Sequence, residues 1–254
     1  MADLRIKMNL PRERSAALWS SIARPKMLVY FCCQGGACKG YESAGFDVTP
    51  VDVVPQPKHY APTKVIVADA ISHLAGLIQS GEIREYAAVA GSPPCQKFTL
   101  AQRIQKREHP DLIAPFRELC LEAGLPYVIE NVPGAPLKDP IELCGAMFGL
   151  HTYRHRLFES NIALAVPMHP RHVTPLVKMG RPLQIGDWYQ AVGNFSNVPY
   201  VRADMGVPWM TREGIRECIP PVYAEHIGRQ LMAHIRASDL VGMASETLPS
   251  GGAS

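Results

Sequence analysis

The chain has 254 residues, of which 47% are hydrophobic and 19% are charged, a composition typical of a folded globular protein and not of a disordered chain. Its 26 Lys and Arg exceed its 23 Asp and Glu by only three, so the net charge alone does not indicate a nucleic-acid partner. No stretch approaches the roughly 18 uncharged apolar residues of a membrane span. These values exclude a membrane-embedded protein, and we expect a soluble one with no membrane partner.

Residues 1–26 are predicted to be an N-terminal extension. They lack a continuous apolar run followed by a cleavage site, so we do not expect a secretory signal, and we predict a cytoplasmic protein. The seven cysteines are an odd number in a chain too long to need disulfides, which favours reduced thiols.

Short apolar runs alternate with helical patterns over the first two-thirds of the chain. The predicted strands are 27–33, 48–54, 64–67, 86–90 and 127–132, and the predicted helices are 36–42, 71–79 and 112–123. This alternation predicts an α/β protein with a Rossmann-like, doubly wound and mostly parallel sheet, covered on both faces.

The periodic pattern is lost over residues 161–208, which we expect to form a small irregular subdomain. A helical pattern returns over 211–236, interrupted at Pro220 and Pro221, and residues 241–254 are expected to be a frayed tail. The catalytic and cofactor-binding domain is therefore predicted to comprise 27–160, completed by 209–240.

Ligands of parallel sheets bind beyond the carboxyl ends of the strands, and the informative loops of this sequence all follow strands. A glycine-containing loop, 34–40, follows the first strand, and Asp52 and Asp69 follow the next two. A glycine turn combined with a carboxylate after the second strand fits an adenosine-containing cofactor.

The loops after the fourth and fifth strands carry reactive side chains. Pro93 and Pro94 stiffen the approach to Cys95, which makes this thiol a candidate nucleophile. Glu130 ends the fifth strand and could donate a proton if burial raised its pKa. Arg154 and Arg156 are candidate cations that could help to ionise the thiol.

In this order, the motifs resemble those of the DNA (cytosine-5) methyltransferases. Residues 31–46 resemble the cofactor motif of that family, 93–96 the nucleophile motif, 130–132 the proton-donor motif, 154–158 the arginine motif and 219–228 the closing cofactor motif. The resemblance implies a fold that binds S-adenosylmethionine and, in 161–208, a short target-recognition region.

The resemblance also implies the reaction. The Cys95 thiolate would attack carbon 6 of a cytosine flipped out of duplex DNA, and carbon 5 would then accept the methyl group of S-adenosylmethionine. The implied catalytic residues are Cys95, Glu130, Asn131, Arg154 and Arg156. The implied cofactor-binding residues are Phe31, Cys32, Cys33, Gln34, Gly35, Gly36, Asp52, Val53, Asp69, Ala70, Ser92, Pro94, Glu217, Cys218 and Ile219.

Contacts to DNA are expected from the segment that follows Cys95 and from the target-recognition region. The candidates are Gln96, Lys97, Thr99, Arg103, Lys106, Arg107, Arg181, Asn194 and Arg202. We expect a monomer that acts on double-stranded DNA in a bacterial cytoplasm or a phage-infected host, alone or beside a restriction enzyme.

Three alternatives remain open. Cys33 stands where the family has glycine and Arg216-Glu217 replaces its usual Gly-Asn, so the group transferred could be a carboxymethyl from carboxy-S-adenosylmethionine, with Arg216 as partner of the added carboxylate. The same chemistry could act on RNA cytosine. The protein could also be a catalytically silent DNA-binding relative.

No metal is expected in the site. The candidate zinc ligands are Cys32, Cys33 and Cys38, or the histidines His151, His155, His169 and His172. Adjacent cysteines at a strand end point to opposite faces, and the histidines lack a paired Cys-x-x-Cys. We interpret these histidines as surface or core residues.

Overall fold

The computed structural model describes residues 23–94, 111–178 and 180–246. Its strands are β1 (Lys26–Tyr30), β2 (Asp47–Asp52), β3 (Ile66–Val67), β4 (Ala88–Gly91), β5 (Tyr127–Asn131), β6 (Ile141–Leu143) and β7 (Arg156–Ser160). Its α-helices are α2 (Gly36–Ser43), α3 (Ala70–Ser80), α5 (Ile113–Ala123), α6 (Val198–Met205), α7 (Arg212–Glu217) and α8 (Pro221–Glu246). Short 3-10 helices span Pro62–Lys64, Glu82–Glu85 and Gly145–Phe148.

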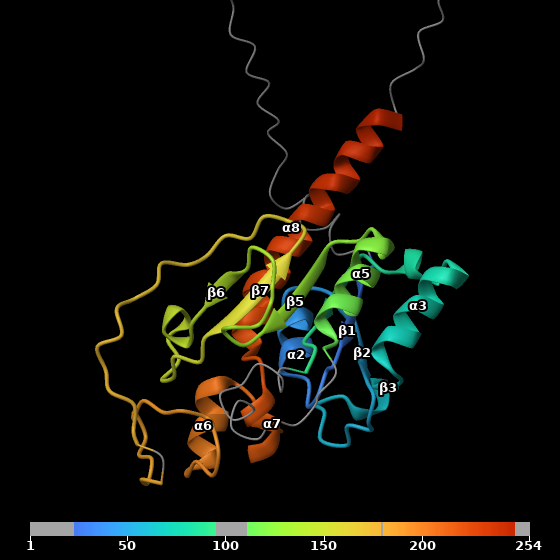
Figure 1. Cartoon of the computed structure of the whole chain (residues 1–254). Coiled ribbons are helices and arrows are strands. Elements are labelled where there is room, and N and C mark those ends of the chain that lie inside the picture. Colours follow the sequence, from blue (N-terminus) through green and yellow to red (C-terminus); the bar gives the residue numbers. More distant parts are fainter. Residues whose placement is uncertain (1–22, 95–110, 179, 247–254) are drawn as a thin grey trace, which may run out of the picture.

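The strands form one seven-stranded sheet in the order β3-β2-β1-β4-β5-β7-β6 (Figure 1). The pairs from β3 to β5 are parallel, whereas β7 is antiparallel to both β5 and β6. The predicted doubly wound, mostly parallel sheet is confirmed. The direction in which strands are added reverses between β1 and β4, which is where such sheets bind ligands.

Strand β1 shows how the sequence places helices on both faces. Met27 and Val29 belong to one core, with side chains from α2 and α8, whereas Leu28 and Tyr30 belong to the other, with side chains from α3 and α5. Successive side chains of a strand point to opposite faces, so a continuous apolar run is what a strand covered on both sides requires.

The C-terminal helical pattern is divided at the predicted point. Helix α7 ends at Glu217 and α8 begins at Pro221, where the missing N–H of proline costs no helical hydrogen bond. Helix α8 crosses α2 closely at Gly40, which has no side chain. A Cβ atom at this position would lie only 2.2 Å from the carbonyl oxygen of Pro221. The helical backbone of α8 continues to Glu246, into the segment 241–254.

The segment 161–208 divides into two parts. The described residues from 161 to 197, all except 179, contain no helix or strand, and α6 then follows, N-capped by Asn197 and with Pro199 in its first turn. A third core joins this segment to α7, and it includes Tyr189, Phe195, Met205, Ile215 and Cys218. The packing therefore continues across the predicted boundary at 208.

Among the described residues, no helix combines the length and the apolar character needed to cross a membrane. Six cysteines, at positions 32, 33, 38, 120, 144 and 218, are free thiols.

Candidate active site

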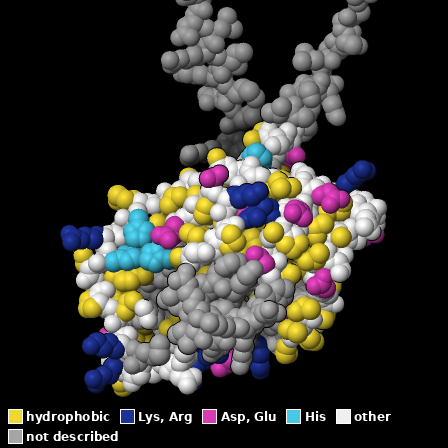
Figure 2. Space-filling model, in the orientation of Figure 1, with side chains coloured by type: hydrophobic (Ala, Val, Ile, Leu, Met, Phe, Trp, Pro, Cys, Tyr) yellow, Lys and Arg dark blue, Asp and Glu magenta, His cyan; other side chains and the backbone are white. Residues whose placement is uncertain are grey.

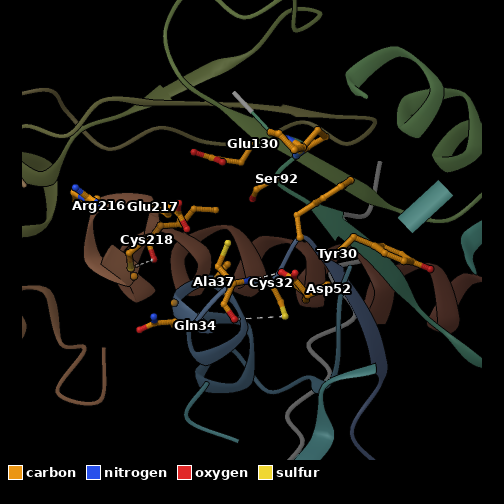
Figure 3. A pocket seen from close by; sticks show the side chains of 18 of the residues that line it. Tyr30, Cys32, Gln34, Ala37, Asp52, Ser92, Glu130, Arg216, Glu217 and Cys218 are labelled. Carbon is orange, nitrogen blue, oxygen red and sulfur yellow. Dashed lines mark hydrogen bonds between the residues drawn. The ribbon is translucent and has the colours of Figure 1, made fainter. Parts of the chain in front are cut away.

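A cavity of about 290 Å³ lies at the carboxyl ends of β1, β2, β4 and β5 (Figure 3). Fourteen of the predicted site residues line it: Phe31, Cys32, Cys33, Gln34, Gly36, Asp52, Val53, Ser92, Pro94, Glu130, Arg156, Glu217, Cys218 and Ile219. Its volume is close to the lower end of small-molecule sites, about 300 Å³.

The loop after β1 has an unusual backbone. Phe31 and Cys33 have φ angles of 56° and 46°, in the left-handed region that favours glycine. The backbone at Cys33 therefore has a conformation typical of glycine although the residue is not glycine. This turn directs the N–H of Cys33 to Asp52 Oδ2, at 2.9 Å.

Asp52 is the buried carboxylate at the end of β2. Its Oδ1 also accepts a hydrogen bond from the N–H of Val54, at 3.1 Å, and its residue is 6% exposed. Each carboxylate oxygen has capacity for another donor, so Asp52 could accept hydrogen bonds from ligand hydroxyls. Phe31, Val53 and Ile219 add apolar surface to the same cavity.

Glu130 lies on the opposite wall, near Ser92 (Figure 3). Its Oε1 is 3.0 Å from Nε of Arg156, because β5 and β7 pair side by side. Burial raises the pKa of Glu130, and the charge of Arg156 and a hydrogen bond with Ser92 oppose that rise. The carboxyl group therefore holds its proton to a higher pH than a free glutamate does.

Asn131 is buried behind the cavity and does not line it. Its Nδ2 donates to the carbonyl oxygen of Pro93, at 3.0 Å, and its Oδ1 accepts from the N–H of Val132, at 2.9 Å. Asn131 thus joins the end of β5 to the proline turn that leads to Cys95. Cys95 itself and the candidate DNA contacts that follow it, Gln96, Lys97, Thr99, Arg103, Lys106 and Arg107, lie outside the described residues.

Arg154 does not line the cavity. Its guanidinium donates to the carbonyl oxygens of Cys218, Ile215 and Arg216, at 2.9, 3.1 and 2.7 Å. Burial, with a smaller contribution from the charge of Arg156, lowers its pKa to about 10. Arg154 therefore fixes the end of α7, and Arg156 is the arginine that reaches Glu130.

The segment around α7 closes the cavity from the far end of the sequence. The side-chain amide of Gln34 donates to Oγ1 of Thr211 and accepts from its N–H, both at 2.9 Å. The backbone oxygen of Gln34 accepts from Nε1 of Trp209, at 2.7 Å. The bonded segments are more than 170 residues apart in the sequence.

Three predicted cofactor residues do not line this cavity. Asp69 caps α3, where its Oδ1 accepts from the N–H and hydroxyl of Ser72, and these hydrogen bonds lower its pKa. Ala70 follows it in α3, and Gly35, with a φ of 86°, precedes α2.

The structure adds cavity residues that the sequence did not suggest as cofactor contacts. These are Val29, Tyr30, Ala37, Pro93, Val132, Met210 and Gly214. Arg216, which the sequence suggested only for the carboxylated cofactor, also lines the cavity. The sequence feature that could have located Gly214 is Thr211, because threonine is a common helix N-cap. In the structure, the Thr211 hydroxyl caps α7 and accepts a hydrogen bond from the N–H of Gly214.

None of the three candidate DNA contacts after β7 lines the cavity. Arg181 and Asn194 are exposed. Arg202 uses its Nε to hold the carbonyl oxygen of Met210, so this atom supports the fold.

No family model and no curated protein sequence matches the chain. Among solved structures, a candidate DNA modification methyltransferase encoded within an E. coli prophage is 15% identical, with a TM-score of 0.58 over 84% of this chain and 99% of that one. The Entamoeba histolytica methyltransferase EhMeth is 13% identical, with a TM-score of 0.55 over 84% of this chain and 99% of that one. At this identity, the likeness and the strand order show that the chain has the Rossmann-like methyltransferase fold.

Proposed function

We propose that this protein is an S-adenosylmethionine-dependent DNA cytosine-5 methyltransferase. The observation that carries the proposal is the placement of Glu130, with its raised pKa, beside Arg156 in a cavity that Pro94 also lines. Pro94 is the residue directly before Cys95 in the sequence. The described neighbours named as methyltransferases, one of them for DNA modification, support the same activity.

The cavity fits the cofactor by its donor set. Asp52 could accept hydrogen bonds from the ribose hydroxyls, and Phe31, Val53 and Ile219 could pack against the adenine. When bound, S-adenosylmethionine supplies an electrophilic methyl carbon on a sulfonium. Carbon 5 belongs to the aromatic ring of cytosine and is a poor nucleophile. The protein must therefore make this carbon nucleophilic before it can take the methyl group.

The residues of the chain divide this task. The Cys95 thiolate forms a bond to carbon 6 while protonated Glu130 donates a proton to ring nitrogen 3, so that the double bond shifts to carbons 4 and 5 and carbon 5 becomes an enamine nucleophile. After carbon 5 has taken the methyl group, water removes the carbon-5 proton, the double bond between carbons 5 and 6 re-forms, and the bond to Cys95 breaks to release the thiolate. Nitrogen 3 returns its proton to the Glu130 carboxylate, which restores the ring and the acid. Arg156 holds Glu130 in place, and Asn131 fixes the turn before Cys95.

The proposal is tested with S-adenosylmethionine labelled in its methyl group and with mixed-sequence duplex DNA. We expect labelled 5-methylcytosine from the wild type and none from Cys95→Ser, whereas Cys120→Ala, which alters a buried thiol in the core between α5 and the sheet, retains activity. Failure of folded wild-type protein to label any DNA would overturn the proposal. Preferential labelling of tRNA in competition would assign RNA as the substrate.

One observation favours a second candidate, transfer of a carboxymethyl group. Arg216 lines the cavity beside Glu217, and it could bind the extra carboxylate of carboxy-S-adenosylmethionine (Figure 3). Mass spectrometry of nucleosides from expressing cells separates the two reactions. We expect 5-carboxymethylcytosine if this candidate is correct, and 5-methylcytosine alone would reject it.

A further inference from the structure

Four potential metal ligands gather at the β6 edge of the sheet, and none of them lines the cavity described above. They are Cys144, His155, His169 and His172, and their candidate ligand atoms all lie within 4.8 Å of one another. Figure 2 shows histidine side chains gathered in one patch on the visible face, beside an acidic side chain.

The β6–β7 hairpin brings the first two ligands together. Leu143 pairs with Arg156 in its antiparallel register, so the next position places Cys144 opposite His155. His169 and His172 come from the irregular segment that follows β7 and returns to this edge. His151, the fourth histidine considered as a zinc ligand from the sequence, does not join them, because its Nδ1 lies 2.6 Å from Oδ1 of Asp204.

Two of the interatomic distances match those of a tetrahedral metal site. Sγ of Cys144 lies 3.3 Å from Nε2 of His172, and Nε2 of His155 lies 3.4 Å from Nε2 of His169. Zinc bonds of about 2.3 Å to sulfur and about 2.0 Å to nitrogen, at tetrahedral angles, place such pairs about 3.5 and 3.3 Å apart. We propose that Cys144, His155, His169 and His172 bind one zinc ion.

The donor chemistry favours zinc and a structural role. One thiolate with three imidazoles is a borderline-soft set suited to tetrahedral zinc, and four protein ligands leave no position open for a substrate. The carboxylate of Glu142, 3.9 Å from Nε2 of His155, adds negative charge beside the ion.

The metal would serve to attach the irregular segment to the sheet. Near His169 and His172, the apolar side chains of Met168 and Val173 are 91% and 74% exposed. Apolar packing by these two side chains therefore does not attach the segment to the sheet. Tyr153 contributes a stacked ring, with its centroid 3.6 Å from that of His172, and its hydroxyl donates to Thr174. The same ion would also fix His155, which stands between Arg154 and Arg156.

The test is the metal content of full-length protein purified without a histidine tag. We expect about one zinc per chain in the wild type, and less than a tenth of that in His172→Ala, an exposed ligand whose loss should leave the core intact. The matched control is His234→Ala, an exposed histidine on α8, which should retain the zinc.

Cobalt provides a second readout. Co²⁺ added to metal-free wild type should give visible ligand-field bands and a near-ultraviolet thiolate charge-transfer band, and the latter should be absent in Cys144→Ser. Zinc should raise the melting temperature of the metal-free wild type and of His234→Ala, but not that of His172→Ala, because only binding to the folded state stabilises it.

Three results would overturn the site. The first is folded wild-type protein without stoichiometric zinc that also fails to bind added Zn²⁺ or Co²⁺. The second is zinc retained in His172→Ala and in Cys144→Ser. The third is a different metal bound stoichiometrically in place of zinc.

Discussion

Glu130 is the buried acid on which the proposed proton transfer depends. Glu130→Gln keeps the size of the side chain but removes the transferable proton, so we expect kcat to fall about 100-fold or more. The binding of S-adenosylmethionine should change little. Single-turnover methyl transfer and equilibrium binding measure the two effects, and Glu118→Gln, on the exposed side of α5, is the control. A kcat within about threefold of wild type would exclude Glu130 as the proton donor.

The raised pKa of Glu130 also predicts a pH dependence of stability. The folded state binds this proton more tightly than the unfolded state, so the contribution is complete below the unfolded pKa of 4.5 and is lost as pH rises through the folded value. Relative to wild type, Glu130→Gln should therefore gain unfolding free energy as pH increases. Urea unfolding at a series of pH values measures this difference, and parallel curves would contradict it.

We expect Asp52 to contribute to the affinity for the cofactor and not to the chemical step of methyl transfer. Asp52→Asn loses one acceptor and the negative charge, and a hydrogen bond to a charged group contributes about 1.5–3 kcal/mol, so the Kd for S-adenosylmethionine should rise at least about 10-fold. Calorimetric titration measures this. Asp47→Asn, at the exposed start of the same strand, should leave the Kd unchanged. Equal affinities in all three proteins would remove Asp52 from the cofactor site.

At the scale of elements, the position of α7 depends on Arg154. Arg154→Met leaves the carbonyl oxygens of Ile215, Arg216 and Cys218 without this donor, and a hydrogen bond to a charged group contributes about 1.5–3 kcal/mol. We expect the unfolding free energy to fall by about 3 kcal/mol and the affinity for S-adenosylmethionine to weaken, because Glu217 and Cys218 line the cavity.

Arg229→Met is the matched control for this variant. Arg229 pairs with Glu225 on the exposed surface of α8, where an ion pair contributes about 1 kcal/mol or less. Chemical unfolding and cofactor titration of both variants decide the matter. An Arg154→Met protein as stable as the control would contradict the positioning role.

Three of the five predicted strands have continuous apolar runs. Strands β1, β4 and β5 are buried on both faces and show no polar interruption near their centres. Strands β6 and β7 were missed for physical reasons: β6 has only three residues, and β7 includes two charged ones, Arg156 and Glu159. Glu159 is nonetheless buried, because Arg117 forms a bidentate pair with it, at 2.6 and 2.7 Å.

The candidate site was predictable where it depends on strand ends. Asp52 and Glu130 each follow from the rule that parallel strands direct their carboxyl ends to one edge, and the structure places both on the cavity. The division of tasks between Arg154 and Arg156 was not predictable, since it depends on a left-handed φ of 31° at Arg154 and on the position of α7. The bonds between Gln34 and Thr211 also depend on the tertiary fold alone.

At the scale of the whole molecule, the net charge of +3 is less informative than its distribution. If Lys106 and Arg107 contact DNA phosphates, their double alanine variant should show a log Kd against log [salt] slope that is shallower by about 0.9 per lost contact. The control is the double alanine variant of Arg84 and Arg229, which are exposed on other elements. Fluorescence anisotropy over a salt series measures both, and equal slopes would exclude these two residues from the DNA contact.

The central claim is that Cys95 forms a covalent bond to carbon 6 of a DNA cytosine. The most direct measurement uses duplex DNA of mixed sequence in which 5-fluorocytosine replaces cytosine, incubated with the protein and S-adenosylmethionine. Fluorine at carbon 5 leaves no proton to remove, so the thiolate cannot depart. We predict a denaturation-resistant complex whose DNA adduct maps to Cys95 by mass spectrometry and is absent in Cys95→Ser. Folded protein that binds both the cofactor and this DNA but forms no adduct would contradict the proposed mechanism.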